Sequence, residues 1–149
     1  MKHMEVIQCW QYEKRKSNIK SDLDNAMKHF YFPKDLFTES LVISENDLFN
    51  LRIKDFSLSQ ESKLSFDEVK KFIKKHEWLG TISPHPTHIF TARYKGLLCG
   101  VVIMDMPNAF SKMLGEKTKE LERLISRGAC ISFSPKNLAS SLIMFSIRW

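Results

Sequence analysis

The sequence has few of the residues that turn, stiffen or cross-link a chain. Its 149 residues include five glycines, five prolines and three cysteines, and they contain no internal repeat or low-complexity segment. No apolar run approaches the roughly 20 residues that a membrane-spanning helix needs. The N-terminal residues also lack the apolar core of a secretory signal. These absences exclude a membrane span and favour one intracellular domain over residues 1–149, of which residues 1–60 are less defined than residues 61–149.

The cysteines are odd in number and lie in or beside apolar segments. Cys9, Cys99 and Cys130 are therefore predicted to be reduced thiols in the core rather than parts of a disulfide framework. The rest of the composition, with 43% hydrophobic and 27% charged residues, is typical of a globular protein. We expect a soluble protein of the cytoplasm.

Basic residues outnumber acidic ones by 23 to 17, which gives a formal net charge of +6. They form two clusters, Lys14–Lys16 with Lys20, and the four lysines of Lys70–Lys75. The second cluster falls in a helical pattern that directs the lysines toward water and the intervening apolar residues toward the core. This charge favours binding to a polyanion, either nucleic acid or a phosphorylated cofactor. The alternative is a solvated surface that only keeps the protein in solution.

The first half of the chain carries weak structural signals and one strong one. Glu5–Tyr12 is predicted to be a first strand, and Ser21–Phe30 a loop or short helix. Ser65-Phe-Asp-Glu68 is a capping box, with serine at the cap and glutamate three residues later. It predicts a helix over Phe66–Trp78 that stops before Gly80.

The second half alternates strand and helix patterns more clearly. A tight turn at Lys95-Gly96 joins an alternating run to a nearly continuous apolar run, the pattern of a hairpin whose second strand is buried. The fold class is therefore α/β or α+β, with helices flanking a sheet in three layers. The predicted elements are strands His88–Tyr94, Leu97–Met104 and Glu120–Ile131, a short helix or loop over Phe110–Lys119, and a final helix over Pro135–Trp149.

The junction of the last predicted strand and helix has the residues of an anion site. Ser134 is a good helix cap, and Pro135 suits the first helical position because its missing N–H would be unpaired there in any case. The backbone N–H groups and the positive end of the helix dipole favour an anion such as phosphate. Lys136 and Ser140 would add donors at the same end.

Two segments carry a resemblance to a known family. The hairpin Phe90-Thr-Ala-Arg-Tyr-Lys-Gly-Leu-Leu-Cys-Gly-Val-Val102 resembles the paired central strands of the GNAT acyltransferase superfamily. The block from Ile125-Ser-Arg127 to Ser134-Pro-Lys-Asn137 is similar to the GNAT-like group that includes the phage Mom DNA-modification proteins. There, a strand with a Leu-Thr-Arg-like triplet runs into an Ala-Pro-Lys-Asn-like helix start. The resemblance covers about residues 66–149.

This resemblance implies a mixed GNAT-like sheet and an acyl-CoA cofactor such as acetyl-CoA. On this chain it puts one group of residues beside the pantetheine arm and a second group at the phosphates. The pantetheine group is Ile131, Ser132 and Phe133, and the phosphate group is Ser134, Lys136, Asn137 and Ser140.

Two further residues are candidates for catalysis. Arg127 stands in an otherwise apolar strand, where it needs an anion or carboxylate as a partner unless it faces outward. Asp105 ends the buried strand, where active-site groups often gather; it would orient an amine nucleophile or act as a base, and the alternative is that it caps the Pro107 turn. His85 and His88 have no clear third ligand, so we predict no metal site. The three tryptophans are expected to be core residues and not a platform for stacking bases.

The final helix is apolar on nearly every side, yet the sequence stops at Trp149. A GNAT-like fold continues with further strands, so we expect either a fragment of a longer protein or a partner chain that completes the sheet.

Two functions remain open from the sequence. The first is an acyl-CoA-dependent GNAT-like transferase, phage-encoded and acting on nucleic acid as in Mom-like DNA modification. The second is a non-catalytic GNAT-like module that binds DNA or a protein, for example in phage replication or gene control. The module would use the positive residues of Lys14–Lys20 and Lys70–Lys75, and its affinity for DNA would fall as salt rises.

Overall fold

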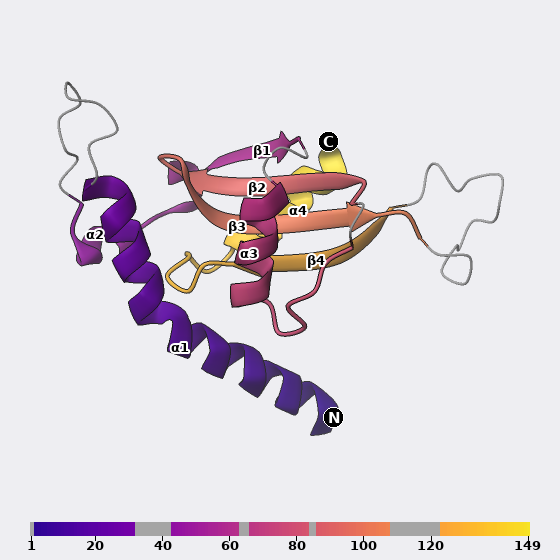
Figure 1. Cartoon of the computed structure of the whole chain (residues 1–149), viewed down its shortest axis with the longest axis horizontal. Coiled ribbons are helices and arrows are strands. Elements are labelled where there is room, and N and C mark those ends of the chain that lie inside the picture. The colour runs from indigo at the N-terminus through magenta and orange to yellow at the C-terminus, as the bar shows by residue number, and fades with distance from the viewer. Residues whose placement is uncertain (1, 32–42, 63–65, 84–85, 108–122) are drawn as a thin grey trace.

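The computed structural model describes residues 2–31, 43–62, 66–83, 86–107 and 123–149, with backbone alone for residues 2–11 and 31. These residues form one four-stranded sheet with helices around it (Figure 1). The helices are α1 (Lys2–Tyr31), α2 (Glu45–Phe49), α3 (Phe66–His76) and α4 (Leu138–Arg148), with a 3-10 turn η1 (Ile53–Asp55). The strands are β1 (Ser57–Glu61), β2 (His88–Tyr94), β3 (Leu97–Asp105) and β4 (Leu124–Cys130).

The sheet has the order β1-β2-β3-β4, and each neighbouring pair is antiparallel. Lys95 and Gly96 both have positive φ, 47° and 88°, as a tight hairpin between β2 and β3 requires. The predicted α+β class and the hairpin are confirmed. The described sheet is antiparallel throughout and not mixed, because its strands follow one another as a meander, without a parallel crossover.

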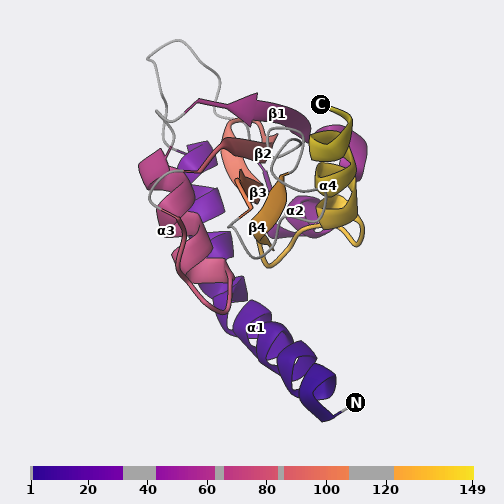
Figure 2. The ribbon, with the colours of Figure 1, turned by 90° about the vertical axis from the view of Figure 1, so that its right-hand side faces the viewer.

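Helices α3 and α4 cover opposite faces of the sheet (Figures 1 and 2). On one face, the Arg93 guanidinium of β2 pairs with Glu61 of β1 and with Glu68 of α3, which fastens that helix to two strands. On the other face, the Phe90 ring lies edge-on to the rings of Phe145 and Trp149, with centroids 6.1 and 5.7 Å apart. The core therefore lies on both sides of β3, which is buried along almost its whole length.

Helix α1 differs most from the sequence-based expectation. The predicted strand over Glu5–Tyr12 is wrong, because one helix runs from Lys2 to Tyr31. Ser21–Phe30 is helical, which was one of its two predicted alternatives, but it belongs to this long helix and is not a short one. Leu23, Ala26 and Phe30 are buried at helical spacing. The helix packs beside α3, and the Phe30 ring lies edge-on to Tyr94 of β2, so its partners are distant in sequence.

The other predicted elements agree with the structure apart from their ends. Helix α3 begins at Phe66 as predicted and ends at His76, two residues early; Ser65 of its capping box lies outside the described residues. The strand predicted over Glu120–Ile131 is described from Leu124, and the Phe110–Lys119 prediction also lies outside the described residues. Cys99 and Cys130 are free thiols, which agrees with the prediction for these two.

None of the described helices combines the length and the apolar character needed to cross a membrane.

Candidate functional site

The residues predicted to bind the cofactor lie in the turn that joins β4 to α4. Helix α4 begins at Leu138 and not at Pro135, so the predicted start of the final helix is wrong. The backbone N–H of Ser134 donates to Ile131 O over 3.1 Å, and Pro135 O accepts from both Asn137 and Leu138. Residues 131–137 thus form consecutive turns before the helix, and Ser134 is not its cap.

Side chains of helix α1 form hydrogen bonds with the backbone of this turn. The Arg15 side chain donates from Nε to Ser132 O over 2.7 Å and from Nη2 to Ser134 O over 2.9 Å. The Asp22 carboxylate accepts from the Ser132 backbone N–H over 3.1 Å. The predicted pantetheine residues Ile131, Ser132 and Phe133 are buried, and so is Ser134. Their backbone groups therefore join the turn to α1.

The exposed end of the turn is the start of α4. Asn137 is the N-cap, with φ of 147°, and its side chain makes no capping hydrogen bond. Lys136, Asn137 and Ser140 are all exposed here. A helix start without a side-chain cap leaves backbone N–H groups available and carries a positive partial charge. Of the residues predicted to contact the phosphates, these three are exposed beside the helix start, whereas Ser134 is buried.

A buried carboxylate joins α1, α3 and the turn. Asp22 is 1% exposed and accepts hydrogen bonds from Lys75 Nζ, from His76 Nε2 at 3.0 Å and from the Ser132 N–H. Burial alone would raise the pKa of Asp22, but these hydrogen bonds outweigh it and hold the pKa well below the usual 3.8. The carboxylate is therefore charged at neutral pH.

The ring of His76 lies between two acceptors. Its Nδ1 is 3.0 Å from Phe72 O, and its Nε2 is 3.0 Å from each Asp22 oxygen. Only a ring with a proton on both nitrogens satisfies both partners. No sequence pattern indicates this role of His76, because Asp22 is 54 residues away and no local spacing links the two.

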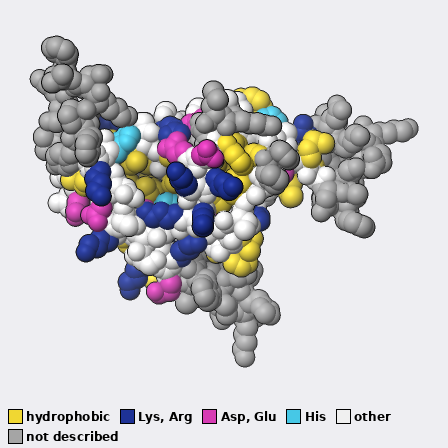
Figure 3. Space-filling model, in the orientation of Figure 1, with side chains coloured by type: hydrophobic (Ala, Val, Ile, Leu, Met, Phe, Trp, Pro, Cys, Tyr) yellow, Lys and Arg dark blue, Asp and Glu magenta, His cyan; other side chains and the backbone are white. Residues whose placement is uncertain are grey.

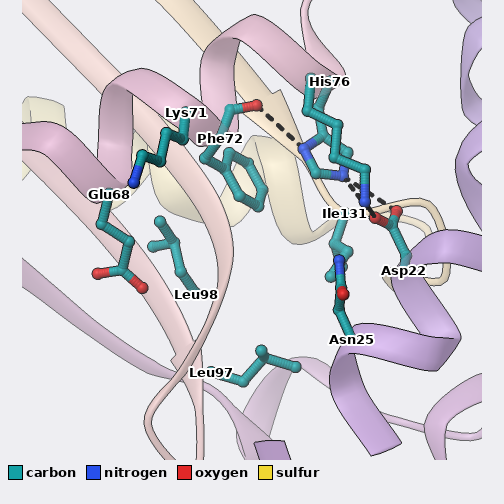
Figure 4. A pocket seen from close by; sticks show the side chains of 10 residues that line it. Asp22, Asn25, Glu68, Lys71, Phe72, His76, Leu97, Leu98 and Ile131 are labelled. Atoms are coloured by element: carbon teal, nitrogen blue, oxygen red, sulfur yellow. Dashed lines mark hydrogen bonds and ion pairs between the residues drawn. The ribbon is translucent and has the colours of Figure 1, made fainter. Parts of the chain in front are cut away.

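A cavity of about 210 Å³ opens beside this cluster, between α1, α3 and the β2–β3 hairpin (Figure 4). Apolar side chains line it together with charged and amide side chains. The lining residues are Asp22, Asn25, Glu68, Lys71, Phe72, Lys75, His76, Leu97, Leu98 and Ile131.

The two basic clusters of the sequence meet on the same side of the molecule. Asn18 of α1 donates to Lys75 O of α3 over 3.0 Å, so the two helices lie side by side. Three basic side chains there have internal partners: Lys14 with Glu77 O, Arg15 with the turn, and Lys75 with Asp22. The exposed lysines form what we call the α1–α3 lysine surface (Figure 3), which consists of Lys16, Lys20, Lys70, Lys71 and Lys74.

The two candidate catalytic residues lie on neighbouring strands without contacting each other. Arg127 is opposite Ile103, and its guanidinium donates to Thr81 O over 2.6 Å and to Ser126 O over 2.6 Å. Asp105 is opposite Leu124 at the end of β3. Its Oδ1 is buried and has no hydrogen-bond partner among the residues that the structure describes, so it has unused acceptor capacity there.

The remaining sequence candidates do not form a site. Within the described residues, no group of three potential ligands is arranged to hold a metal ion, and His85 lies outside them. His88 instead packs against the Trp149 ring, with centroids 5.1 Å apart. The expectation of core tryptophans is wrong for Trp78 and Trp149, which are 49% and 64% exposed.

No protein-family model, curated protein or solved structure matches this chain.

Proposed function

We propose that this protein is an acyl-CoA-dependent transferase of the GNAT-like kind, with acetyl-CoA or another acyl-CoA as the acyl donor. The observation that carries the proposal is the route from β4 to α4. An edge strand of the described sheet, with exposed Leu124, Ile125 and Gly128, leads through a turn to a helix start whose N-cap residue, Asn137, makes no side-chain capping hydrogen bond. An edge strand offers unpaired backbone groups to the amides of a pantetheine arm, and the helix start offers N–H groups to a pyrophosphate.

In this proposal, different residues would bind the cofactor and take part in catalysis. Lys136, Asn137 and Ser140 would hold the phosphates, and the buried residues 131–134 would fix the turn that presents them. An amine would attack the thioester carbonyl carbon of an acyl-CoA, forming an amide as the C–S bond breaks and CoA leaves as its thiol. Asp105 would accept the proton of that amine through its unpartnered Oδ1, and Arg127 would orient the loop at Thr81 with its hydrogen bonds.

Isothermal titration with acetyl-CoA tests this proposal. A Lys136→Glu, Asn137→Ala double variant removes two phosphate contacts and adds repulsion. Since a hydrogen bond to a charged group contributes about 1.5–3 kcal/mol, affinity should fall by more than about 10-fold. Lys54→Glu is the matched control, because this exposed lysine lies in η1 and undergoes the same charge change. Absence of saturable binding to the wild-type protein, or equal affinity in both variants, would contradict the proposal.

A second candidate function is a module that binds nucleic acid without catalysis. It is favoured by the α1–α3 lysine surface, where exposed lysines come from two neighbouring helices. Phosphate contacts release counterions, so affinity for DNA would fall on the order of 10²-fold between about 50 and 200 mM salt if four contacts form.

The lysine surface can be tested apart from the cofactor. Lys70→Glu with Lys74→Glu should weaken DNA binding and flatten its salt dependence. Arg148→Glu, on the opposite face in α4, is the control and should leave both unchanged. Salt-dependent DNA binding without acetyl-CoA binding favours the module over the transferase. Absence of DNA binding at low salt contradicts the module.

A further inference from the structure

The turn after α3 holds a tryptophan in water. Trp78 is 49% exposed and its neighbour Leu79 is 46% exposed. A single exposed apolar side chain is ordinary on a protein surface. The turn that carries Trp78, however, is fixed in place by a set of hydrogen bonds around Glu77.

Three contacts define this turn. The Glu77 backbone N–H donates to Ile73 O over 2.9 Å, and Glu77 O accepts from Lys14 Nζ of α1 over 2.6 Å. The Glu77 carboxylate accepts from the Gly80 N–H over 2.9 Å. Gly80 has φ of +63°, the left-handed conformation that glycine adopts without strain. The indole is thus attached to an ordered backbone, which lowers the entropic cost of using it in binding.

The position of Trp78 relates it to the lysine surface. It follows Lys74 by four residues, and the Lys14–Glu77 contact places its turn where α1 meets α3. A flat aromatic group at the border of a lysine-rich surface is complementary to a polyanion that also presents flat apolar faces. Unpaired nucleotides have both features, whereas a duplex hides the faces of its bases within the stack.

We propose that Trp78 stacks on an unpaired base of a nucleic acid whose backbone lies on the α1–α3 lysine surface. The preferred partner is then single-stranded or locally unpaired nucleic acid. This inference rests on the nucleic-acid binding proposed above and adds the state of the strand. The lysines provide attraction that is independent of sequence, and the indole distinguishes single strands from duplexes.

Fluorescence anisotropy with a labelled oligothymidine of about 10 nucleotides tests the inference against a duplex of equal length. If Trp78 stacks on one base, Trp78→Ala should lower the affinity for the single strand by about 10-fold or more. The affinity for the duplex should change by less than about 2-fold, because the faces of its bases are stacked and not available. Trp78→Phe should retain much of the affinity for the single strand, because phenylalanine can also stack on a base. Leu79→Ala, which shortens the adjacent exposed side chain, should lower this affinity only slightly.

A second measurement reports contact with the indole itself. In a Trp10→Phe, Trp149→Phe background, the emission of Trp78 should be quenched by the single strand and not by the duplex. Unquenched emission with intact binding would overturn the stacking inference, as would an equal loss of affinity for both probes in Trp78→Ala. Neither result would contradict the nucleic-acid function itself. If neither probe binds in a salt-dependent way, the nucleic-acid function fails, and this inference fails with it.

Discussion

At the scale of single residues, Asp22 joins three parts of the described chain that are far apart in sequence. It accepts hydrogen bonds from Lys75 and His76 of α3 and from the turn at Ser132. A buried carboxylate is costly unless it is paired, and removal of one partner leaves the remaining charges uncompensated. The stability of the contact between α1, α3 and the turn therefore depends on this one charge.

Asp22→Asn should destabilise the protein by about 3 kcal/mol, because it keeps the side-chain shape but leaves Lys75 and His76 without their carboxylate. Urea unfolding at neutral pH measures the change. Asp24→Asn is the control, since Asp24 is exposed on the same helix and should change stability by less than about 0.5 kcal/mol. Equal stabilities for the two variants would contradict the assigned role of Asp22.

The two described cysteines should resist alkylation. Burial raises the pKa of Cys99 to about 12 and that of Cys130 to about 11, so both stay protonated at pH 8, and the thiolate is the reactive form. In a Cys9→Ser background, we expect iodoacetamide to modify the native protein at least about 10²-fold more slowly than the urea-unfolded protein. Similar rates for the two states would show that these thiols are accessible.

At the scale of elements, close packing sets the position of α4 against the sheet. A Cβ at Gly100 of β3 would lie 3.3 Å from Ala92 Cβ and 3.4 Å from both Cys130 Sγ and Leu142 Cδ2. The helix therefore approaches the sheet as closely as a residue without a side chain allows. Since α4 follows the proposed cofactor turn, this packing also fixes the orientation of the helix start.

Gly100→Val should destabilise the protein by about 2 kcal/mol, because added γ-carbons would force α4 away from β3. Gly128→Val in the exposed part of β4 is the matched control. A Cβ there would be 3.6 Å from Val101 O and 3.8 Å from Val102 Cγ2, which are ordinary contacts, so we expect a change within about 0.5 kcal/mol. Chemical denaturation compares the two, and a larger loss for Gly128→Val would contradict this packing.

At the scale of the whole molecule, a charged cluster and a basic surface share one side. The α1–α3 lysine surface is positive. The neighbouring Lys75 and His76 are instead paired with the buried Asp22 carboxylate. The fold thus separates lysines that stabilise the protein from lysines that remain available to a ligand. The sequence alone did not make this separation, because Lys74 and Lys75 are adjacent and have opposite roles.

The low pKa of Asp22 predicts a specific loss of stability in acid. The folded protein binds this proton less readily than the unfolded chain, so the stabilisation is fully present above the unfolded value near 3.8 and is lost as the pH falls below it. The difference in unfolding free energy between wild type and Asp22→Asn should therefore shrink below about pH 4. Urea titrations at several pH values measure it; a difference independent of pH would contradict this linkage.

Local patterns were sufficient for the central part of the fold. The alternation of Ile89 to Tyr94, the Lys95-Gly96 turn and the apolar run of β3 predict a hairpin because each depends on neighbours in the chain. The helix α3 follows in the same way from its cap and apolar stripe. The full length of helix α1 did not follow from local patterns, since its buried residues contact segments distant in the chain, such as Tyr94 beside Phe30. The turn before α4 was misread because Ser-Pro is a helix-start signal only when the serine is free to cap.

The sequence by itself determined the elements whose signals are local, the excess of positive charge, and the residue types near the start of the last helix. Only the tertiary structure decided which of these residues are available. It buried residues 131–134 under Arg15 and Asp22, left Lys136, Asn137 and Ser140 exposed, and placed Trp78 in water beside the lysine surface. The physical reason is that burial and pairing are set by contacts between segments far apart in the chain, which no local spacing encodes.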